Sequence, residues 1–379
     1  MFAYSIKDQV IDVVGALSFE EDGDGWVTPR RLPEWTVAQF ADAEMDRFSK
    51  FPSGVRLRFA TKANLITLSV RVSRLVITGI AEQVRPAAFD LLIDGVENQT
   101  QIAENGNILR LTATAPAVLT ETLEVGDTDL LTFSDLGDHE KVIEIWLPTS
   151  SMVGISEIAA SSEIHKAPLD TRKKWLHYGS SISQCIEADR PMDAWSIRAS
   201  QLLNVNLTNF GLAGQCQLDG FVARAMADLP ADVITLKLGI NVINADSMRE
   251  RAFIPAVHNF LDTLREKSPK TPIIIISAIW CPFHETIPGP TMIDGTSFIS
   301  KERPAELATG ALTLERTREL LKEIVLKRSD ENLHFMDGLT LFGEADESSL
   351  PDKLHPNSAG YRLMGERFAQ AQQSFFERI

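Results

Sequence analysis

Cysteine is scarce in this chain: its 379 residues include only Cys185, Cys216 and Cys281. Three cysteines are too few for a disulfide framework, and an odd number leaves at least one of them unpaired. We therefore expect the protein to work in a reducing cytoplasm. A redox or catalytic role for Cys185 or Cys216 is the alternative, but a buried cysteine usually behaves as a small hydrophobic side chain.

Excess positive charge and long apolar runs are missing as well. Lys and Arg total 37 against 52 Asp and Glu, and the formal net charge is −15. This balance argues against nucleic acid or an anionic membrane surface as the main partner. No run of about eighteen or more apolar residues is present, so no transmembrane helix is expected. Residues 1–8 lack the basic-then-apolar order of a secretory signal, although a mature chain with its signal removed would look the same.

Metal and dinucleotide motifs are also absent from the sequence. Four histidines show no metal-ligand spacing with cysteines or carboxylates: His139, His165, His258 and His334. Gly211 and Gly214 do not complete a dinucleotide fingerprint, because Asn209 stands where its first glycine would be. We therefore expect neither a metal nor a cofactor.

The character of the chain changes near residues 160–175. Before this point, short runs that alternate apolar and polar residues predict strands over 55–59, 68–72, 89–93 and 142–146. Several short strands separated by turns are typical of an antiparallel sandwich, and we expect a jelly roll or a similar fold. The polar segment 161–168 is interpreted as a linker, which predicts two domains, 1–165 and 166–379.

In the second half, strand-like and helical patterns alternate, as a parallel sheet requires. The predicted strands cover 175–178, 205–209, 233–238, 273–278 and 333–336. The predicted helices cover 194–203, 221–228, 249–267, 314–328 and 360–376, with Pro255 expected to kink or restart the third of these.

Two short segments of this second half can together supply a nucleophile, a base and an orienting acid. Ser181 lies in Gly-Ser-Ser-Ile-Ser after the first predicted strand, and Asp352 and His355 lie in Asp-Lys-Leu-His-Pro near the C-terminus. Serine is a poor nucleophile unless an imidazole takes its proton and a carboxylate orients that imidazole. Taken alone, each segment could instead be an ordinary polar turn.

Two further segments lie between these in chain order, and each follows a predicted strand. They are Asn-Phe-Gly-Leu-Ala-Gly at 209–214 and Gly-Ile-Asn at 239–241. In a doubly wound sheet, ligands bind at the carboxyl ends of the strands, so all four segments could face one crevice.

The four segments resemble, in order, the sequence blocks of the SGNH hydrolases, also called GDSL-type esterases and lipases. By this resemblance Ser181 is the nucleophile and also an oxyanion-hole donor, together with Gly214 and Asn241. Asp352 and His355 complete the triad. The implied fold is a flavodoxin-like three-layer α/β/α parallel sheet, here preceded by the β-sandwich that one branch of the family carries.

The sequence departs from the family pattern at two positions. Ser180 replaces the usual Asp before the nucleophile, and Val242 replaces the Asp that commonly follows the oxyanion Asn. Neither carboxylate belongs to the triad, so the resemblance implies a serine esterase that cleaves a small acyl group, for example acetyl, from a carbohydrate or glycoside. An acyltransferase using the same acyl-enzyme and an inactive carbohydrate-binding protein are the alternatives.

A long segment with four prolines, 281–311, follows the fourth predicted strand and should emerge at the same edge as the triad. Long loops in compact domains are often lids or binding loops. We select four residues at or near its start as candidates for the substrate pocket: Trp280, Phe283, His284 and Glu285. A structural insertion is the alternative. His177 is expected to be a buried structural histidine, and Arg30 and Arg31 are expected to be solvated.

Overall fold

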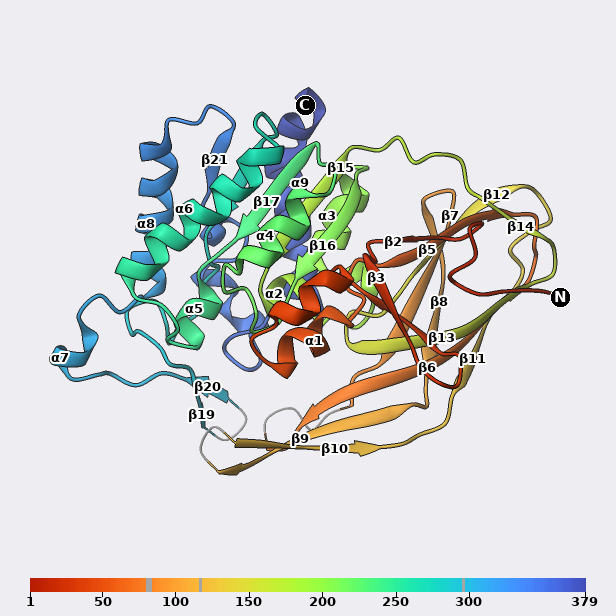
Figure 1. Ribbon diagram of the computed structural model, residues 1–379, viewed down its shortest axis with the longest axis horizontal. Helices are drawn as coiled ribbons and strands as arrows, with labels where there is room; N and C mark the ends of the chain where they lie inside the picture. Colours follow the sequence, from red (N-terminus) through yellow and green to blue (C-terminus); the bar gives the residue numbers. More distant parts are fainter. Residues whose placement is uncertain (80–83, 116–117, 295–296) are drawn as a thin grey trace. The chain divides into compact units, whose positions relative to one another are not determined.

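The computed structural model describes residues 1–79, 84–115, 118–294 and 297–379 (Figure 1). The chain forms two compact units. The first, which we call the sandwich unit, comprises Met1–Glu34, Ser49–Thr171 and Ile186–Asp193. The second, the α/β unit, comprises Trp35–Phe48, Arg172–Cys185 and Ala194–Ile379. The division of the chain into two separately folding domains, between residues 165 and 166, stays a prediction.

The sandwich unit is built from two sheets of mainly antiparallel strands. Within the described residues, one sheet has the order β10-β9-β6-β13-β4-β3, with β1 on β13 and β11 on β6. Its strands are β1 (Phe2–Tyr4), β3 (Ser18–Glu21), β4 (Val27–Arg30), β6 (Ile66–Ile77), β9 (Asn107–Ala115), β10 (Val118–Glu124), β11 (Asp129–Phe133) and β13 (Ser151–Ala160). The other sheet has the order β14-β5-β12-β7-β8, with β2 on β5. Its strands are β2 (Asp12–Val14), β5 (Arg56–Thr61), β7 (Ala87–Ile93), β8 (Val96–Ala103), β12 (Lys141–Trp146) and β14 (Ile164–His165).

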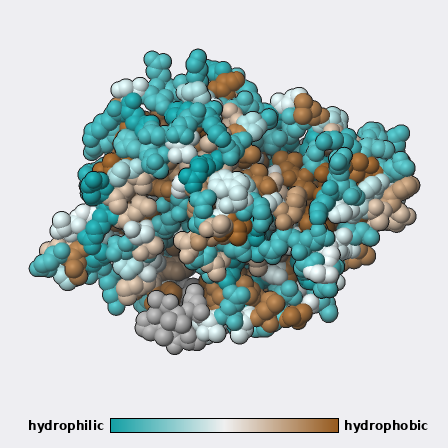
Figure 2. Space-filling view, viewed as in Figure 1, coloured by the Kyte–Doolittle hydropathy of each residue, from teal (hydrophilic) through white to brown (hydrophobic). Residues whose placement is uncertain are grey.

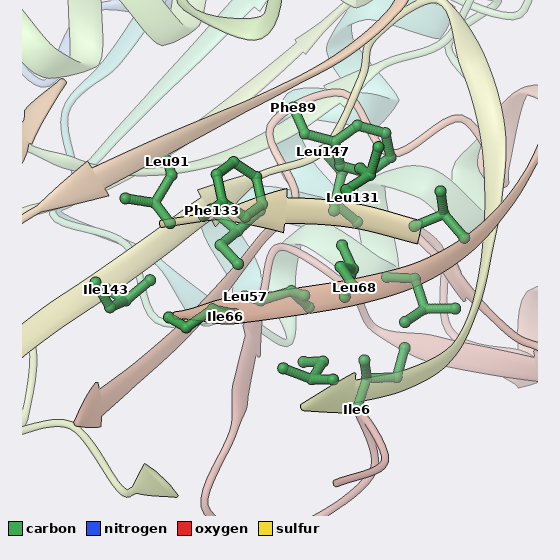
Figure 3. Packing of buried hydrophobic residues seen from close by; sticks show 14 of the residues in the cluster. Ile6, Leu57, Ile66, Leu68, Phe89, Leu91, Leu131, Phe133, Ile143 and Leu147 are labelled. Atoms are coloured by element: carbon green, nitrogen blue, oxygen red, sulfur yellow. The ribbon is translucent and has the colours of Figure 1, made fainter. Parts of the chain in front are cut away.

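The core of this unit lies between the two sheets and follows the predicted alternation. Along β6 every second residue is buried, because successive side chains of a strand point to opposite faces. Leu68 of one sheet and Leu57 and Phe89 of the other belong to one buried cluster (Figure 3). Fully burying such a side chain stabilises a fold by about 1.5–3 kcal/mol. The prediction of an antiparallel sandwich before the α/β fold is confirmed.

Three details of the sandwich unit differ from expectation. Strands β6 and β9 pair in parallel, which is possible because the β7–β8 hairpin of the other sheet separates them in the chain. Residues 164–165, inside the predicted linker, form the edge strand β14, whose two residues are too short to show periodicity. Arg30 and Arg31 are buried rather than solvated, and the Arg31 Nε donates to the Phe51 carbonyl at 2.6 Å.

The α/β unit contains a parallel sheet with the order β16-β15-β17-β18-β21, which is the flavodoxin-like order 2-1-3-4-5. The strands are β15 (Lys174–Gly179), β16 (Asn206–Gly211), β17 (Val233–Lys237), β18 (Ile273–Ile276) and β21 (Leu333–Met336). All of their described pairings are parallel. Each strand overlaps a predicted one, and the predicted fold class is confirmed.

Helices cover both faces of this sheet. Those of the predicted pattern are α3 (Trp195–Leu202), α4 (Gly220–Ala227), α6 (Glu250–Lys267), α8 (Leu314–Arg328) and α9 (Ser358–Arg378). Trp175 of β15 stacks on Phe368 of α9, whereas Tyr178, which has the opposite parity on the strand, stacks on Phe260 of α6. The two rings therefore mark opposite faces of the sheet. Helix α6 continues through Pro255, so a restart there is wrong, while the alternative of a kink stays a prediction.

Short helices and strands between the main elements complete the α/β unit. They are α2 (Ser181–Gln184), α5 (Ile240–Asn244), β19 (Met292–Asp294), β20 (Ser297–Ile299), α7 (Ala305–Ala308), η3 (Gly338–Thr340) and η4 (Glu344–Ser349), with α1 (Ala43–Ser49) and η1 (Glu34–Gln39) contributed largely by segment 35–48. The short helix η2 (Pro191–Asp193) belongs to the sandwich unit. The sequence did not predict that segment 35–48 packs with the α/β unit, where Phe40 contacts Phe221 of α4.

The surface is mainly hydrophilic on the face drawn in Figure 2, with apolar residues in small groups. Such scattered apolar residues are normal for a protein surface. In the four described ranges, we find no helix that is both long and apolar enough to span a bilayer.

Candidate active site

The segment that carries Ser181 is a sharp passage from strand β15 into the short helix α2. Ser180 occupies the N-cap position, and its hydroxyl accepts a hydrogen bond from the Ile182 N–H at 3.3 Å. This bond satisfies one of the amides that a helix start leaves open. Ser180 is fully buried, so the residue that replaces the family Asp supports the loop through its hydroxyl. Gly179 is needed because a Cβ there would lie 2.2 Å from the Ser183 Oγ.

Asp352 and His355 lie in a turn that leads into helix α9. The Asp352 Oδ1 accepts hydrogen bonds from the Leu354 N–H at 2.9 Å and the His355 N–H at 2.7 Å. Asn357 then caps α9 by accepting from the Gly360 N–H at 3.0 Å. The second carboxylate oxygen of Asp352 lies 2.7 Å from the His355 Nδ1. The backbone of the turn thus fixes the carboxylate, and the carboxylate fixes the imidazole.

The structure brings Ser181 to this pair, although 174 positions separate it from His355 in the chain. The Ser181 Oγ lies 2.9 Å from the His355 Nε2. Burial alone would raise the pKa of Asp352, but the charge of His355 and the hydrogen bonds from the turn outweigh it, so the pKa is lowered. An ionised Asp352 keeps the proton of His355 on Nδ1, which leaves Nε2 as the acceptor facing the serine hydroxyl.

Gly214 lies in the loop after β16, and Asn241 lies near the start of α5, which follows β17. Gly214 has φ +71°, which favours glycine, and a Cβ built there would meet nothing within 4 Å. Asn241 is buried, and its Oδ1 accepts from the Cys216 N–H at 3.0 Å. That bond anchors the oxygen end of the amide and leaves the nitrogen end as a donor. Val242, where the family commonly has Asp, is buried.

The segment 281–311 reaches the triad through a residue that the sequence analysis did not select. The Phe298 ring meets the His355 ring edge-on, with centroids 5.8 Å apart, and the Phe298 N–H lies 3.3 Å from the Asp352 carbonyl oxygen. Residues 295–296 of this segment lie outside the described residues. A single aromatic residue in a long aperiodic loop carries no sequence signal for such a contact.

The four residues selected for the substrate pocket have different surroundings. Trp280 and Phe283 are half-buried, and the Trp280 Nε1 donates to Glu347 at 3.0 Å. His284 is buried, with its ring nitrogens bonded to the Ile287 carbonyl and the Thr291 hydroxyl. Glu285 is buried and holds Arg318 through two hydrogen bonds of 2.6 and 2.8 Å. These bonds give His284 and Glu285 a part in fixing the loop, while contact of any of the four with a substrate stays a prediction.

Two further residues with reactive side chains, His177 and Cys216, are buried. His177 is fully buried, as expected. Burial, and then the charge of Lys237, lowers its pKa to about 3. Burial likewise raises the pKa of Cys216 to about 12, which disfavours the reactive thiolate. Neither residue therefore offers a second base or a second nucleophile at neutral pH.

Comparisons with known proteins bear on the family resemblance and the fold. Residues 172–287 match the model of the GDSL-like Lipase/Acylhydrolase family. A search of the curated proteins finds no match. Among solved structures, a salicylyl-acyltransferase from a tetracycline biosynthetic pathway, SsfX3, has TM-score 0.77 and 24% identity over 99% of this chain and 97% of that chain.

Two further solved structures share the architecture across both units. A GDSL-like lipase from Bacteroides ovatus has TM-score 0.65 and 22% identity over 97% of this chain and 96% of that chain. A family two carbohydrate esterase from Clostridium thermocellum, solved with cellohexaose, has TM-score 0.59 and 13% identity over 97% of this chain and 100% of that chain. At these identities the likeness shows a shared fold. The family match over residues 172–287 and this shared fold together confirm the predicted resemblance to the GDSL-like or SGNH type.

Proposed function

We propose that this protein is a serine esterase that hydrolyses a small acyl ester through a Ser-His-Asp triad. One observation carries the proposal: a continuous chain of hydrogen bonds runs from the Ser181 Oγ through both ring nitrogens of His355 to Asp352, with distances of 2.9 and 2.7 Å. Both lengths lie within hydrogen-bond reach of a nucleophile, its base and the acid that orients it.

The proposed reaction has two halves. In the first, His355 Nε2 takes the hydroxyl proton while the Ser181 Oγ attacks the ester carbonyl carbon, and the imidazolium then gives this proton to the leaving alcohol. In the second, water attacks the acyl-enzyme, gives a proton to His355, and releases the acid as the Ser181 oxygen regains a proton. Asp352 stays ionised throughout and stabilises the imidazolium.

The negative charge that forms on the carbonyl oxygen needs donors that are already in position. The proposed donors are the backbone amides of Ser181 and Gly214 and the side-chain amide of Asn241. Support comes from the open space beside Gly214 and from the Cys216 N–H that orients the Asn241 side chain. Removing one such donor typically lowers the rate by about 10²–10³-fold.

The proposed substrate is an acetyl or similarly small ester on a carbohydrate. This part rests on architecture alone, since structural neighbours include family two carbohydrate esterases and an acetyl xylan esterase from Butyrivibrio proteoclasticus. The negative net charge of the chain is compatible with a neutral sugar as substrate. Trp280 and Phe283 are the half-buried candidates for lining the acyl or alcohol side. Two domains divided near residue 165 and a cytoplasmic location belong to the same proposal.

Acyl transfer to an alcohol other than water is the second candidate. The observation that favours it is the TM-score of 0.77 with a salicylyl-acyltransferase over nearly the whole of both chains. Hydrolysis and transfer would share the acyl-enzyme and differ in whether the site excludes water and positions an acceptor.

The test is turnover of p-nitrophenyl acetate, butyrate and octanoate, alone and with sugar or simple alcohol acceptors, with all products identified by mass. Ser181-dependent release of free acid would support the esterase, and the chain-length trend would size the acyl pocket. Dominant acyl transfer at low acceptor concentration would favour the second candidate. No turnover, combined with tight binding of a saccharide, would favour a carbohydrate-binding protein without activity.

A further inference from the structure

Gln217 joins the two loops that would form the oxyanion hole. Its Nε2 donates to the Gly214 carbonyl at 3.2 Å and to the Asn241 carbonyl at 3.1 Å. Its Oε1 accepts from the Ser247 hydroxyl at 2.6 Å. One side-chain amide therefore contacts the loop after β16, the start of α5 and the turn that follows α5.

The orientation of this amide follows from its partners. Two of them are carbonyl oxygens, which can only accept, so the NH₂ end must face them. The Ser247 hydroxyl can donate to the remaining oxygen, and the Ser247 N–H is itself anchored to the Val242 carbonyl at 3.1 Å. All three contacts are satisfied in this orientation, whereas a flipped amide would set oxygen against two carbonyl oxygens.

The position of Gln217 matters because two of the proposed donors come from separate loops. The Gly214 N–H lies in the loop after β16 and the Asn241 side-chain amide lies on α5. The two donors must converge on one oxygen atom to stabilise it. The Cys216 N–H already orients the Asn241 side chain at 3.0 Å. Gln217 adds a bond to the backbone of each loop, which fixes their separation.

We propose that Gln217 is a positioning residue for the oxyanion hole, which it builds by joining the Gly214 loop to the Asn241 helix. This inference rests on the proposed function. Gln217 touches neither the acyl group nor the leaving alcohol in this role, so its loss lowers the rate of the acyl-transfer step and leaves ground-state binding of the substrate nearly unchanged.

The test measures kcat and KM of Gln217→Met, which keeps the length of the side chain but donates no hydrogen bond. We expect kcat to fall about tenfold with KM within about twofold of wild type, since an error of 1 Å in a catalytic group can cost about 10²-fold. In Gln217→Glu a carboxylate faces the two carbonyl oxygens, so kcat is expected to fall further than in Gln217→Met. Gln215→Met is the matched control, because no side-chain hydrogen bond of Gln215 occurs among the described contacts, and it should keep the wild-type kcat.

A double variant separates positioning from general loosening of the fold. If Gln217 acts through Asn241, the variant Gln217→Met/Asn241→Ala should be only slightly slower than Asn241→Ala alone, because the donor that Gln217 positions is already gone. Independent loss of structure would instead multiply the two effects. If Gln217→Met folds poorly, Ser247→Ala is the second variant. It removes the hydroxyl that donates to the Gln217 Oε1, and it should lower kcat a few-fold.

The outcomes distinguish the inference from the function it rests on. Wild-type turnover that disappears in Ser181→Ala supports the proposed function whatever Gln217 does. If that turnover is present and Gln217→Met keeps the wild-type kcat, or if its loss multiplies with that of Asn241→Ala, the positioning role is overturned alone. If wild type shows no Ser181-dependent turnover, both the function and the inference fail.

Discussion

The α/β unit contains two serine–histidine pairs, and they have almost the same geometry. Ser181 and His355 are 2.9 Å apart, and Ser183 and His177 are 2.8 Å apart. The Nδ1 of His355 lies 2.7 Å from the carboxylate of Asp352, whereas the Nδ1 of His177 lies 2.7 Å from the hydroxyl of Thr235. The first pair is half-buried and the second is fully buried.

The comparison shows that a hydrogen bond between serine and histidine is no sign of catalysis by itself. His355 can become an imidazolium because a carboxylate is present to stabilise the new charge. His177 cannot do so easily, because burial and the nearby Lys237 lower its pKa to about 3. The same two residue types thus support a candidate catalytic site in one place and a structural hydrogen-bond network in the other.

The largest contrast is expected between the two serines. Ser181→Ala should lower kcat by about 10⁶-fold, the scale on which loss of a triad nucleophile acts, and leave the thermal midpoint near the wild-type value. Ser183→Ala should keep most activity but cost about 1–3 kcal/mol of stability, because it leaves a buried His177 nitrogen without its partner. Ester hydrolysis and thermal unfolding of both variants measure this, and comparable activity in the two would remove the basis of the comparison.

The next contrast is between Asp352 and Thr235, which contact the Nδ1 atoms of His355 and His177. Asp352→Asn should lower kcat about 10⁴-fold, because an amide no longer holds His355 in the tautomer that accepts from serine. Thr235→Val should act on stability, since the Thr235 hydroxyl also accepts from the Trp175 Nε1 at 2.8 Å. Each buried partner lost there costs about 1–3 kcal/mol. An active Asp352→Asn enzyme would argue against the triad.

Two buried asparagines, Asn241 of α5 and Asn209 of β16, offer a further contrast. Asn241→Ala should lower kcat by about 10²–10³-fold with little change in KM, as expected for a donor used in the transition state. Asn209 is also buried, but its side chain bonds the Ser183 carbonyl and the Gly211 N–H, both at 2.9 Å. Asn209→Ala should therefore lose more stability and less activity than Asn241→Ala, and the reverse order would contradict both assignments.

The sequence could predict the parts of this site that follow strand ends. Ser181, Gly214 and Asn241 each follow shortly after the end of a predicted strand, and parallel strands bring their carboxyl ends to one edge. The short spacing of Asp352 and His355 also predicted their mutual contact. Local periodicity and one topological rule predicted that these segments meet at one edge, whereas the role expected of each residue came from the family resemblance.

The contacts that sequence could not predict are those between segments without such periodicity. Phe298 contacts His355 from the short strand β20, in a segment without periodicity in the sequence, and segment 35–48 joins the α/β unit from far along the chain. Gln217 is similar, because a glutamine after a glycine-rich loop is usually solvated. In each of these cases tertiary packing decides the contact, and neither composition nor spacing records it.

His177 should also affect stability at low pH. His177 has a folded pKa of about 3, below its ordinary 6.5, so between these values the unfolded chain binds the proton and the native protein does not. The stabilisation is complete above pH 6.5 and is lost as the pH falls toward 3. Its contribution to the slope can approach about 1.4 kcal/mol per pH unit for one proton.

Urea unfolding at several pH values between 7.5 and 4 would measure this contribution in wild type and in His177→Gln. Groups shared by the two proteins cancel in the difference between their curves, so the gap in unfolding free energy should be largest at neutral pH and shrink toward pH 4. His177→Gln stays uncharged in both states, and it can keep a bond to Ser183 or Thr235. Parallel curves would mean that His177 takes up a proton within the folded protein, and the distinction drawn here between a structural and a catalytic imidazole would then rest on Asp352 alone.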